Sequence, residues 1–222
     1  DQELSAGMLN RGVSNAQKKV EERNLAMRKH LLEYDDVLNQ QREIIYDLRN
    51  KALLSDSIKD TINEFIEDFI FDIIGDLDFR QVKEWDWQSI NQQINSNLMV
   101  NIEVGEIESL ESLDELIDHI NEEALKYYKL KEDVIPTELL RKVEKFIVLK
   151  TIDEKWRNHL LGMDQLREGI GLRAYGQKNP LIEYKSESYN FFQELMVSLR
   201  ATVIQRVFHA QVSDQVQAQQ NP

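Results

Sequence analysis

The stretch from Ser14 to about Leu53 constrains the fold of this chain more than any other. It contains neither glycine nor proline, so no residue in it must interrupt a helix. Ser14 and Gln17 fit a capping box, in which each side chain satisfies a backbone N–H at the start of a helix. A helix from Ala16 to Leu53 would be about 57 Å long at 1.5 Å per residue. We therefore expect one long helix against which other elements pack.

Apolar residues recur along this stretch in alternating steps of three and four, the spacing of a heptad seam. Leu32, Val37 and Ile44 lie off the seam, so more than one flank is expected to have a partner. Asn24 and Gln41 lie on it, and would either specify a coiled-coil register or face a polar part of another domain. The apolar seam residues are Val13, Val20, Met27, Leu31, Tyr34, Leu38, Ile45, Leu48 and Ala52.

Composition narrows the classes of protein that this chain can represent. There is no run of about 20 apolar residues and no signal-peptide pattern, and the absence of cysteine fits a reducing compartment. The net charge is −13, and residues 54–136 carry 21 acidic and six basic side chains. Such acidity disfavours nucleic-acid binding. The phosphate-binding pattern G-x-x-x-x-G-K-[ST] is missing, so we expect no ATP hydrolysis by this chain alone.

The acidic middle of the chain is predicted to form short helices. One carries Ile58, Ile62, Phe65, Phe69 and Ile73 at helical spacing and ends near Gly75. A shorter helix is suggested by Trp85, Trp87, Ile90, Ile94 and Leu98, and residues 98–105 alternate weakly, as in a strand-like connector. A second capping box, formed by Ser112 and Glu115, opens another helix.

Two long apolar stripes follow Pro136, separated by the densest turn signal in the chain. Gly169, Gly171, Gly176 and Pro180 lie within twelve residues, which predicts an antiparallel helical hairpin. Gly162 interrupts the first arm at a cost of about 1 kcal/mol relative to alanine. The first stripe is Leu139, Val143, Phe146, Leu149, Ile152, Trp156, Leu160, Met163 and Leu166. The second is Tyr184, Phe191, Phe192, Leu195, Leu199, Val203 and Val207.

Two long runs of the sequence resemble SecA, the motor subunit of the bacterial preprotein translocase. NAQKKVEERNLAMRKHLLEYDDVLNQQR is similar to the start of its helical scaffold, and LKTIDEKWRNHLLGMDQLREGIGLRAYGQKNPLIEYKSESYNFF to its two-helix finger. The matches are collinear, cover about half the chain, and leave the acidic middle where SecA carries its helical wing. The resemblance implies an all-α fold: a long scaffold helix, an inserted small helical wing and an antiparallel two-helix finger.

On this basis we divide the chain into five segments. We expect a linker remnant at 1–13, a scaffold helix at 14–54 and an acidic wing at 55–135. The two-helix finger should occupy 136–212 and pack on the scaffold, with its tip at 169–180. The polar tail 213–222 should be disordered.

The tip of the hairpin is the main candidate site. Leu172, Arg173, Tyr175, Gln177 and Lys178 place apolar, aromatic and cationic groups among glycines, which suits sequence-tolerant contact with a polypeptide. An ordinary turn whose tyrosine packs on its own arms is the alternative. The resemblance implies that Tyr175 is the fingertip aromatic that contacts the translocating chain. The tip departs from the common family pattern in the order of Ala174 and Gly176 and at Asn179, where Asp is frequent.

A second candidate is the polar group around a seam tyrosine, formed by Glu33, Tyr34, Asp35 and Asp36. These residues either dock a neighbouring element or form a solvated helix face, and the family's corresponding run contacts the motor and the preprotein-binding domain. His30 and His119 lie near carboxylates but lack the E-x-x-H order of a helical di-metal site. We therefore expect no metal or catalytic residue, and expect the four histidines to be solvated.

The function implied by the resemblance is the scaffold, wing and finger portion of a translocation motor, which contacts preprotein and the SecY channel and transmits ATP-driven movement. ATP and Mg²⁺ would bind the motor and zinc the C-terminal tail, both outside this chain, so we expect no cofactor here. The expected partners are unfolded preproteins, the SecY channel, and the motor and preprotein-binding domains, with a possible homodimer. Membrane contact should be indirect, from the cytoplasmic face of the bacterial inner membrane. The alternative is a cytoplasmic coiled-coil adaptor that self-associates along residues 13–52.

Overall fold

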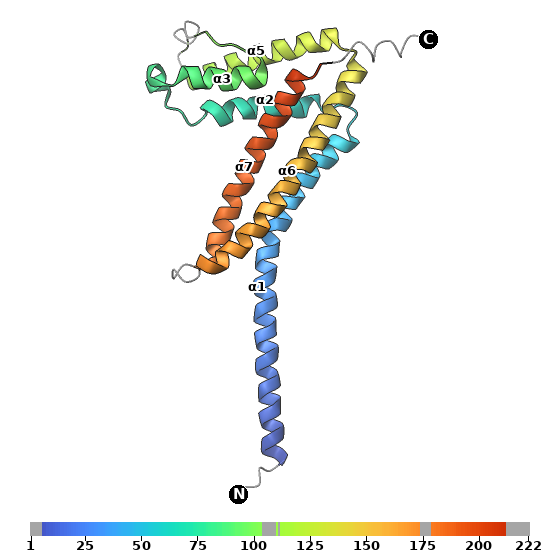
Figure 1. Cartoon of the computed structure of the whole chain (residues 1–222), viewed down its shortest axis with the longest axis vertical. Coiled ribbons are helices and arrows are strands. Elements are labelled where there is room, and N and C mark those ends of the chain that lie inside the picture. Colours follow the sequence, from blue (N-terminus) through green and yellow to red (C-terminus); the bar gives the residue numbers. More distant parts are fainter. Residues whose placement is uncertain (1–5, 104–109, 111, 174–178, 212–222) are drawn as a thin grey trace, which may run out of the picture. The chain divides into compact units, whose positions relative to one another are not determined.

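The computed structural model describes residues 6–103, 110, 112–173 and 179–211 (Figure 1). Within these residues the regular structure is entirely helical, which confirms the all-α prediction. The elements in chain order are α1 (Ala6–Leu54), α2 (Lys59–Ile74), the short 3-10 helix η1 (Phe79–Glu84), α3 (Trp87–Leu98), α5 (Leu113–Val134), α6 (Thr137–Arg173) and α7 (Pro180–His209).

The chain divides into two compact units, each described here by itself. The first comprises Asp1–Ile44 and Met163–Tyr189, and the second comprises Ile45–Gly162 and Asn190–Pro222. Helices α1, α6 and α7 therefore each contribute residues to both units.

In the first unit, the start of α1 differs from the expected one. The helix begins at Ala6, so Ser14 and Gln17 lie inside it and the predicted capping box is wrong. The glycines at 7 and 12 each cost a helix only about 1 kcal/mol, which the long helix that follows them tolerates. Local capping signals therefore misplace the start by two turns.

In the second unit, α2, α3 and α5 gather into a small helical layer (Figure 1). Helix α2 lies against both of the others and buries two faces, because Ile66, Ile70 and Ile74 are covered as well as the predicted Ile62 and Phe65. The capping box at α5 is confirmed in part, since the Ser112 hydroxyl accepts a hydrogen bond of 3.2 Å from the Glu115 N–H. The predicted strand-like connector is not a strand over 98–103, and its remainder to 105 lies outside the described residues.

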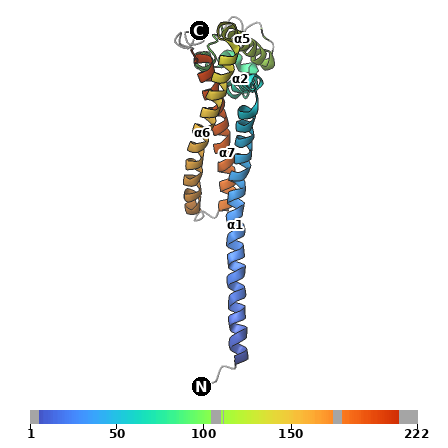
Figure 2. The ribbon, with the colours of Figure 1, turned by 90° about the vertical axis from the view of Figure 1, so that its right-hand side faces the viewer.

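Helices α6 and α7 run side by side in this unit (Figure 2). The predicted stripe on α7 is largely confirmed, and the later part of the stripe on α6 is confirmed at Ile152 and Trp156, which are buried. In the earlier part of α6 the predicted register is wrong. Phe146 is exposed, whereas Leu140, Val148 and the polar residues Glu144 and Thr151 are buried. The buried line runs one or two positions away from the most apolar one because the neighbouring helices supply polar partners for it.

A buried polar cluster joins α2, α5 and α6. The Tyr128 hydroxyl donates a 2.5 Å hydrogen bond to Glu144, and Arg141 donates to both of these residues at 2.6 Å. Arg141 also pairs with Glu132, whose carboxylate accepts bonds of 2.6 and 2.8 Å from Lys59. Burial raises the pKa of Glu144, while the hydrogen bond from Tyr128 and the charge of Arg141 oppose that change.

His159 and Gly162 define the closest packing of α6 on α7. The His159 ring is 3% exposed and stacks on Trp156 and Phe191, with centroid separations of 5.4 and 4.9 Å. A Cβ added at Gly162 would lie 2.4 Å from Cζ of Phe191, so the glycine makes room for that ring. Burial lowers the pKa of His159 to about 4. The expectation that all four histidines are solvated is therefore wrong for this one, because rings from α7 cover it.

We predict that His159 makes stability depend on pH. Below its ordinary pKa of 6.5 the histidine is protonated in the unfolded chain, but it stays neutral in the folded one down to about pH 4. The free energy of unfolding should thus fall by about 2 kcal/mol between pH 7 and 5. Urea unfolding of His159→Phe should lack this loss, whereas the exposed-site control His209→Phe should keep it. An equal loss in both variants would contradict the assignment.

We also predict that Gly162→Ala destabilises the protein although alanine is the better helix former. The helix should gain up to about 1 kcal/mol from propensity, but overpacking against Phe191 should cost about 1–3 kcal/mol. Gly169→Ala is the matched control in α6, because no atom of the described residues is found within 4 Å of its added Cβ. Thermal unfolding should show a decrease for the first and an increase for the second; an increase in both would refute the steric argument.

Candidate functional site

The site that the described residues form around Tyr34 lies in the first unit. Tyr34 is 8% exposed, and its ring packs against Tyr184 of α7 with a centroid separation of 4.7 Å. His30, one turn earlier in α1, lies 5.0 Å from the same ring. Burial raises the pKa of Tyr184. The heptad position thus supplies an aromatic contact between α1 and α7, as a seam residue should.

Arg167 of α6 completes this site with a charge. Its guanidinium lies over the Tyr34 ring, 5.7 Å from the centroid, and donates a 3.3 Å hydrogen bond to Asp35. Both charged side chains are largely exposed, so we expect the ion pair to contribute less than about 1 kcal/mol. We call Tyr34, Asp35, Arg167 and Tyr184 the tyrosine site.

The structure places the other predicted members of this group differently. Asp36 is exposed, and Glu33 is half-buried. The tyrosine site therefore includes Tyr34 and Asp35 of the predicted four. Tyr184 joins them from the predicted inner stripe of the last helix, and Arg167 was not singled out by the sequence pattern. A contact of this group with another domain stays a prediction.

Gln41 shows what a polar seam position does here. Its side chain is buried, and its amide donates a 3.0 Å hydrogen bond to the backbone carbonyl of Ser188 in α7. A buried polar group is stabilised when it is hydrogen-bonded, so Gln41 fits the interior of the first unit. This contact is with another helix of the same chain.

The predicted fingertip falls at the edge of the described residues. Leu172 and Arg173 belong to the last turn of α6, and nothing is described of their side chains. Tyr175, Gln177 and Lys178 lie outside the described residues.

The first half of α1 carries a row of exposed apolar side chains. Most of these residues follow the heptad spacing, and Leu25 and Leu32 lie beside it. No described residue covers them, and more than half of each is accessible to solvent. Such a row is typical of a surface that meets another protein or domain. Its members are Leu9, Val13, Val20, Leu25, Met27, Leu31 and Leu32.

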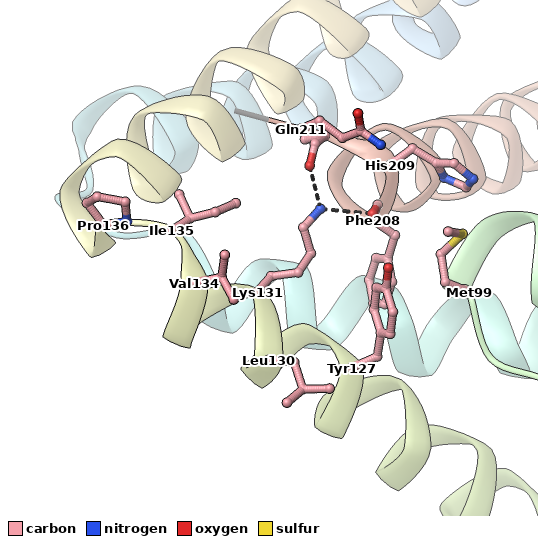
Figure 3. Close-up of a pocket in the computed structure, with 11 residues that line it drawn as sticks. Met99, Tyr127, Leu130, Lys131, Val134, Ile135, Pro136, Phe208, His209 and Gln211 are labelled. Carbon is pink, nitrogen blue, oxygen red and sulfur yellow. Dashed lines mark hydrogen bonds between the residues drawn. The ribbon is translucent and has the colours of Figure 1, made fainter. Parts of the chain in front are cut away.

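A cleft of about 540 Å³ opens in the second unit between α5 and the end of α7 (Figure 3). Lys131 lies in its wall and donates hydrogen bonds of 2.6, 2.8 and 2.9 Å to the carbonyls of Val207, Phe208 and Ala210. Its ammonium group neutralises the partial negative charge at the end of α7. Burial lowers the pKa of Lys131. Its three donors are occupied, so Lys131 holds the helix end in place.

Two features are absent from the part of the chain that the structure describes. Across 6–103, 112–173 and 179–211, histidines and carboxylates do not gather in a group of three or more that could hold a metal ion. No helix in this part of the chain is both long enough and apolar enough to cross a membrane.

Comparison with known proteins gives one consistent family. Residues 3–211 match the model described as the SecA Wing and Scaffold domain. The chain is 37% identical over 211 residues to protein translocase subunit SecA of Heliobacterium modesticaldum, covering 94% of this chain and 25% of that protein. It is 38% identical to the subunit of Thermodesulfovibrio yellowstonii, covering 98% and 24%, and 39% identical to SecA 1 of Chlorobium chlorochromatii, covering 92% and 20%. The chain thus spans a quarter or less of these relatives.

We predict that Tyr34→Ala loosens the first unit. Removing a buried ring against Tyr184 should cost about 3 kcal/mol, whereas Tyr189→Ala, at a position 62% exposed in the same unit, should change stability by less than about 0.5 kcal/mol. Amide hydrogen exchange over residues 180–188 measures the difference. Equal protection in both variants would show that the tyrosine contact does not hold this unit together.

Proposed function

Because this chain belongs to the family of SecA wing and scaffold domains, we propose that it transmits movement between a motor and a translocating polypeptide. The observation that carries the proposal is the family match over residues 3–211. The ATPase activity, the preprotein substrate and the SecY channel belong, in this proposal, to the whole translocase. This chain would supply the helices that couple the ATPase motor to the translocating polypeptide.

We assign the segments by their helices. The scaffold is 14–54, the wing 55–135 and the finger 136–212, and the ends of α1 at Leu54 and α5 at Val134 support these limits. In this assignment the finger is α6 and α7, joined at the tip 169–180. Because α1 begins at Ala6, residues 6–13 belong to the scaffold helix in this assignment and not to the expected linker. Residues 1–5 and the polar tail 213–222 lie outside the described residues.

The tyrosine site would hold the tip end of the finger to the scaffold, because Arg167 and Tyr184 directly flank the tip in sequence. Tyr34 and Asp35 on α1 contact Tyr184 and Arg167 on the two finger helices, so a force on the finger would reach α1 through side chains already in contact. Glu33 and Asp36 remain available for the motor or the preprotein-binding domain. Leu172, Arg173, Tyr175, Gln177 and Lys178 would meet the substrate or the channel mouth.

The exposed apolar row on the first half of α1 supports a scaffold role. Apolar side chains of this number are covered in a complete protein, and the relatives are at least four times as long as the matched region. We propose that the motor and preprotein-binding domains of the same protein cover the row. The whole protein would act at the cytoplasmic face of the bacterial inner membrane, with indirect contact to anionic lipid.

The same row also favours a second candidate, a coiled-coil adaptor that dimerises along residues 13–52. Light scattering separates the two functions. An adaptor should form a tight dimer without any motor, whereas a scaffold should be monomeric or associate weakly.

We predict that the fingertip contacts substrate, which a cysteine cross-link can test. The chain contains no cysteine, so Tyr175→Cys can be placed in the whole translocase subunit with its other cysteines removed. A stalled cysteine-bearing preprotein and the cytoplasmic mouth of SecY are the two targets. Disulfides should form at 175 but not at the exposed control Tyr189→Cys or at mid-arm Asp153→Cys. No cross-link from 175 in translocation-competent protein would reduce the tip to a structural turn.

A further inference from the structure

Phe71 is exposed on a helix that buries most of its other large apolar side chains. The side chain of Phe71 in α2 is 57% exposed, whereas the preceding residues Phe69 and Ile70 are buried. A Cβ at Gly75 would lie 2.7 Å from Cδ2 of the Phe71 ring, so the ring lies close against the end of α2. The ring is therefore positioned by its own helix without being part of the core.

Beside this ring, α2 and α5 form an open cleft of about 350 Å³. The cleft is lined by two apolar side chains, one from each helix, and by four carboxylates. The helical spacing of Glu67 and Phe71, and of Asp114 and Asp118, puts each pair on one face of its helix. The lining residues are Glu67, Asp68, Phe71, Asp114, Ile117 and Asp118.

The negative charge of this cleft is little compensated. The nearby cation, Arg200, is engaged by Asp72 through hydrogen bonds of 2.6 to 2.8 Å and lies 3.8 Å from Asp68. Among the described residues, no ion pair involves Glu67, Asp114 or Asp118. The surrounding segment, residues 54–136, has 21 acidic and six basic side chains, which would attract a cationic partner from solution.

The chemistry of the cleft selects among cations. An arginine or lysine can lie over an aromatic face and pair with carboxylates at its edge, and Arg does both with one planar group. A metal ion is a poorer occupant, because the carboxylates in the described residues do not converge in a group of three that could hold one. The apolar surface of Phe71 and Ile117 would also remain uncovered by a bare ion.

We propose that this cleft docks a basic amphipathic segment of a polypeptide partner, with an arginine or lysine over Phe71 and apolar neighbours against Ile117. The wing thereby gains a binding surface of its own, separate from the tyrosine site and the fingertip. Its test does not involve translocation, so its failure would leave the proposed function unaffected.

The test uses the complete chain and a fluorescein-labelled amphipathic peptide with leucine on one helical face and arginine on the other. Fluorescence anisotropy measures its dissociation constant, which should rise with salt because exposed charges are screened. Phe71→Ala should weaken binding about 5-fold, and Asp114→Asn with Asp118→Asn about 10-fold. A peptide with glutamate in place of arginine should not bind.

Matched controls separate this cleft from the general acidity of the chain. Asp133→Asn removes the same kind of charge from the exposed surface of α5, and Phe146→Ala removes an exposed aromatic ring from α6. Both should leave the dissociation constant within about 2-fold of the parent value. Asp118→Arg should weaken binding of the arginine peptide and allow the glutamate peptide to bind.

Several results would overturn the proposal. One is equal binding by the parent chain and Phe71→Ala, and another is an equal loss in Asp133→Asn and in the double asparagine variant. Binding that calcium alone abolishes at constant ionic strength would assign the cleft to a metal ion instead.

Discussion

Glu144 carries a carboxylate into the interior of the second unit, where a charge is stable only with partners around it. Tyr128 provides one partner from α5, and Arg141 provides another from the preceding turn of α6. Arg141 in turn pairs with Glu132. Glu132 also forms an ion pair with Lys59 at the start of α2. Helices α5 and α6 thus supply the direct partners of this charge, and α2 is linked to them through Glu132. Removing a single partner leaves a buried ion uncompensated, which typically costs about 3–5 kcal/mol.

That constraint also explains which parts of the fold the sequence predicts. On α7 the apolar periodicity identifies most of the buried residues, such as Leu199. On α2 it identifies one buried face, which includes Phe65, but not the second face with Ile66, Ile70 and Ile74. On α6 the buried line contains Glu144, Thr151 and His159, because their partners come from helices that are distant in sequence. A pattern that counts only apolar residues chooses Phe146 and misplaces the face. Polar contacts between helices that are distant in sequence cannot be predicted from the spacing of apolar residues.

The tyrosine site was predictable in one half only. The heptad spacing placed Tyr34 at a contact position, and Asp35 beside it could be named as a polar neighbour. Tyr184 could be placed on the inner stripe of the last helix but not at this contact, and Arg167 was not identified. Both contacts depend on how α6 and α7 approach α1. The same limit applies to the exposed apolar row: spacing shows that Val20 and Met27 share a face, but not what covers it. The wing's acidity was evident from composition, whereas the exposed ring of Phe71 within it required coordinates.

The close approach at Gly162 bears on how the paired helices can respond to force. Sliding α6 by one turn of about 5.4 Å would bring Asn158 or Leu166 opposite Phe191 in place of the glycine. Neither side chain fits where even a methyl group would lie 2.4 Å from the ring. A ratchet-like shear of one helix past the other is thus sterically blocked at this point. The contact at Gly162 therefore fixes the register of α6 against α7 at this point.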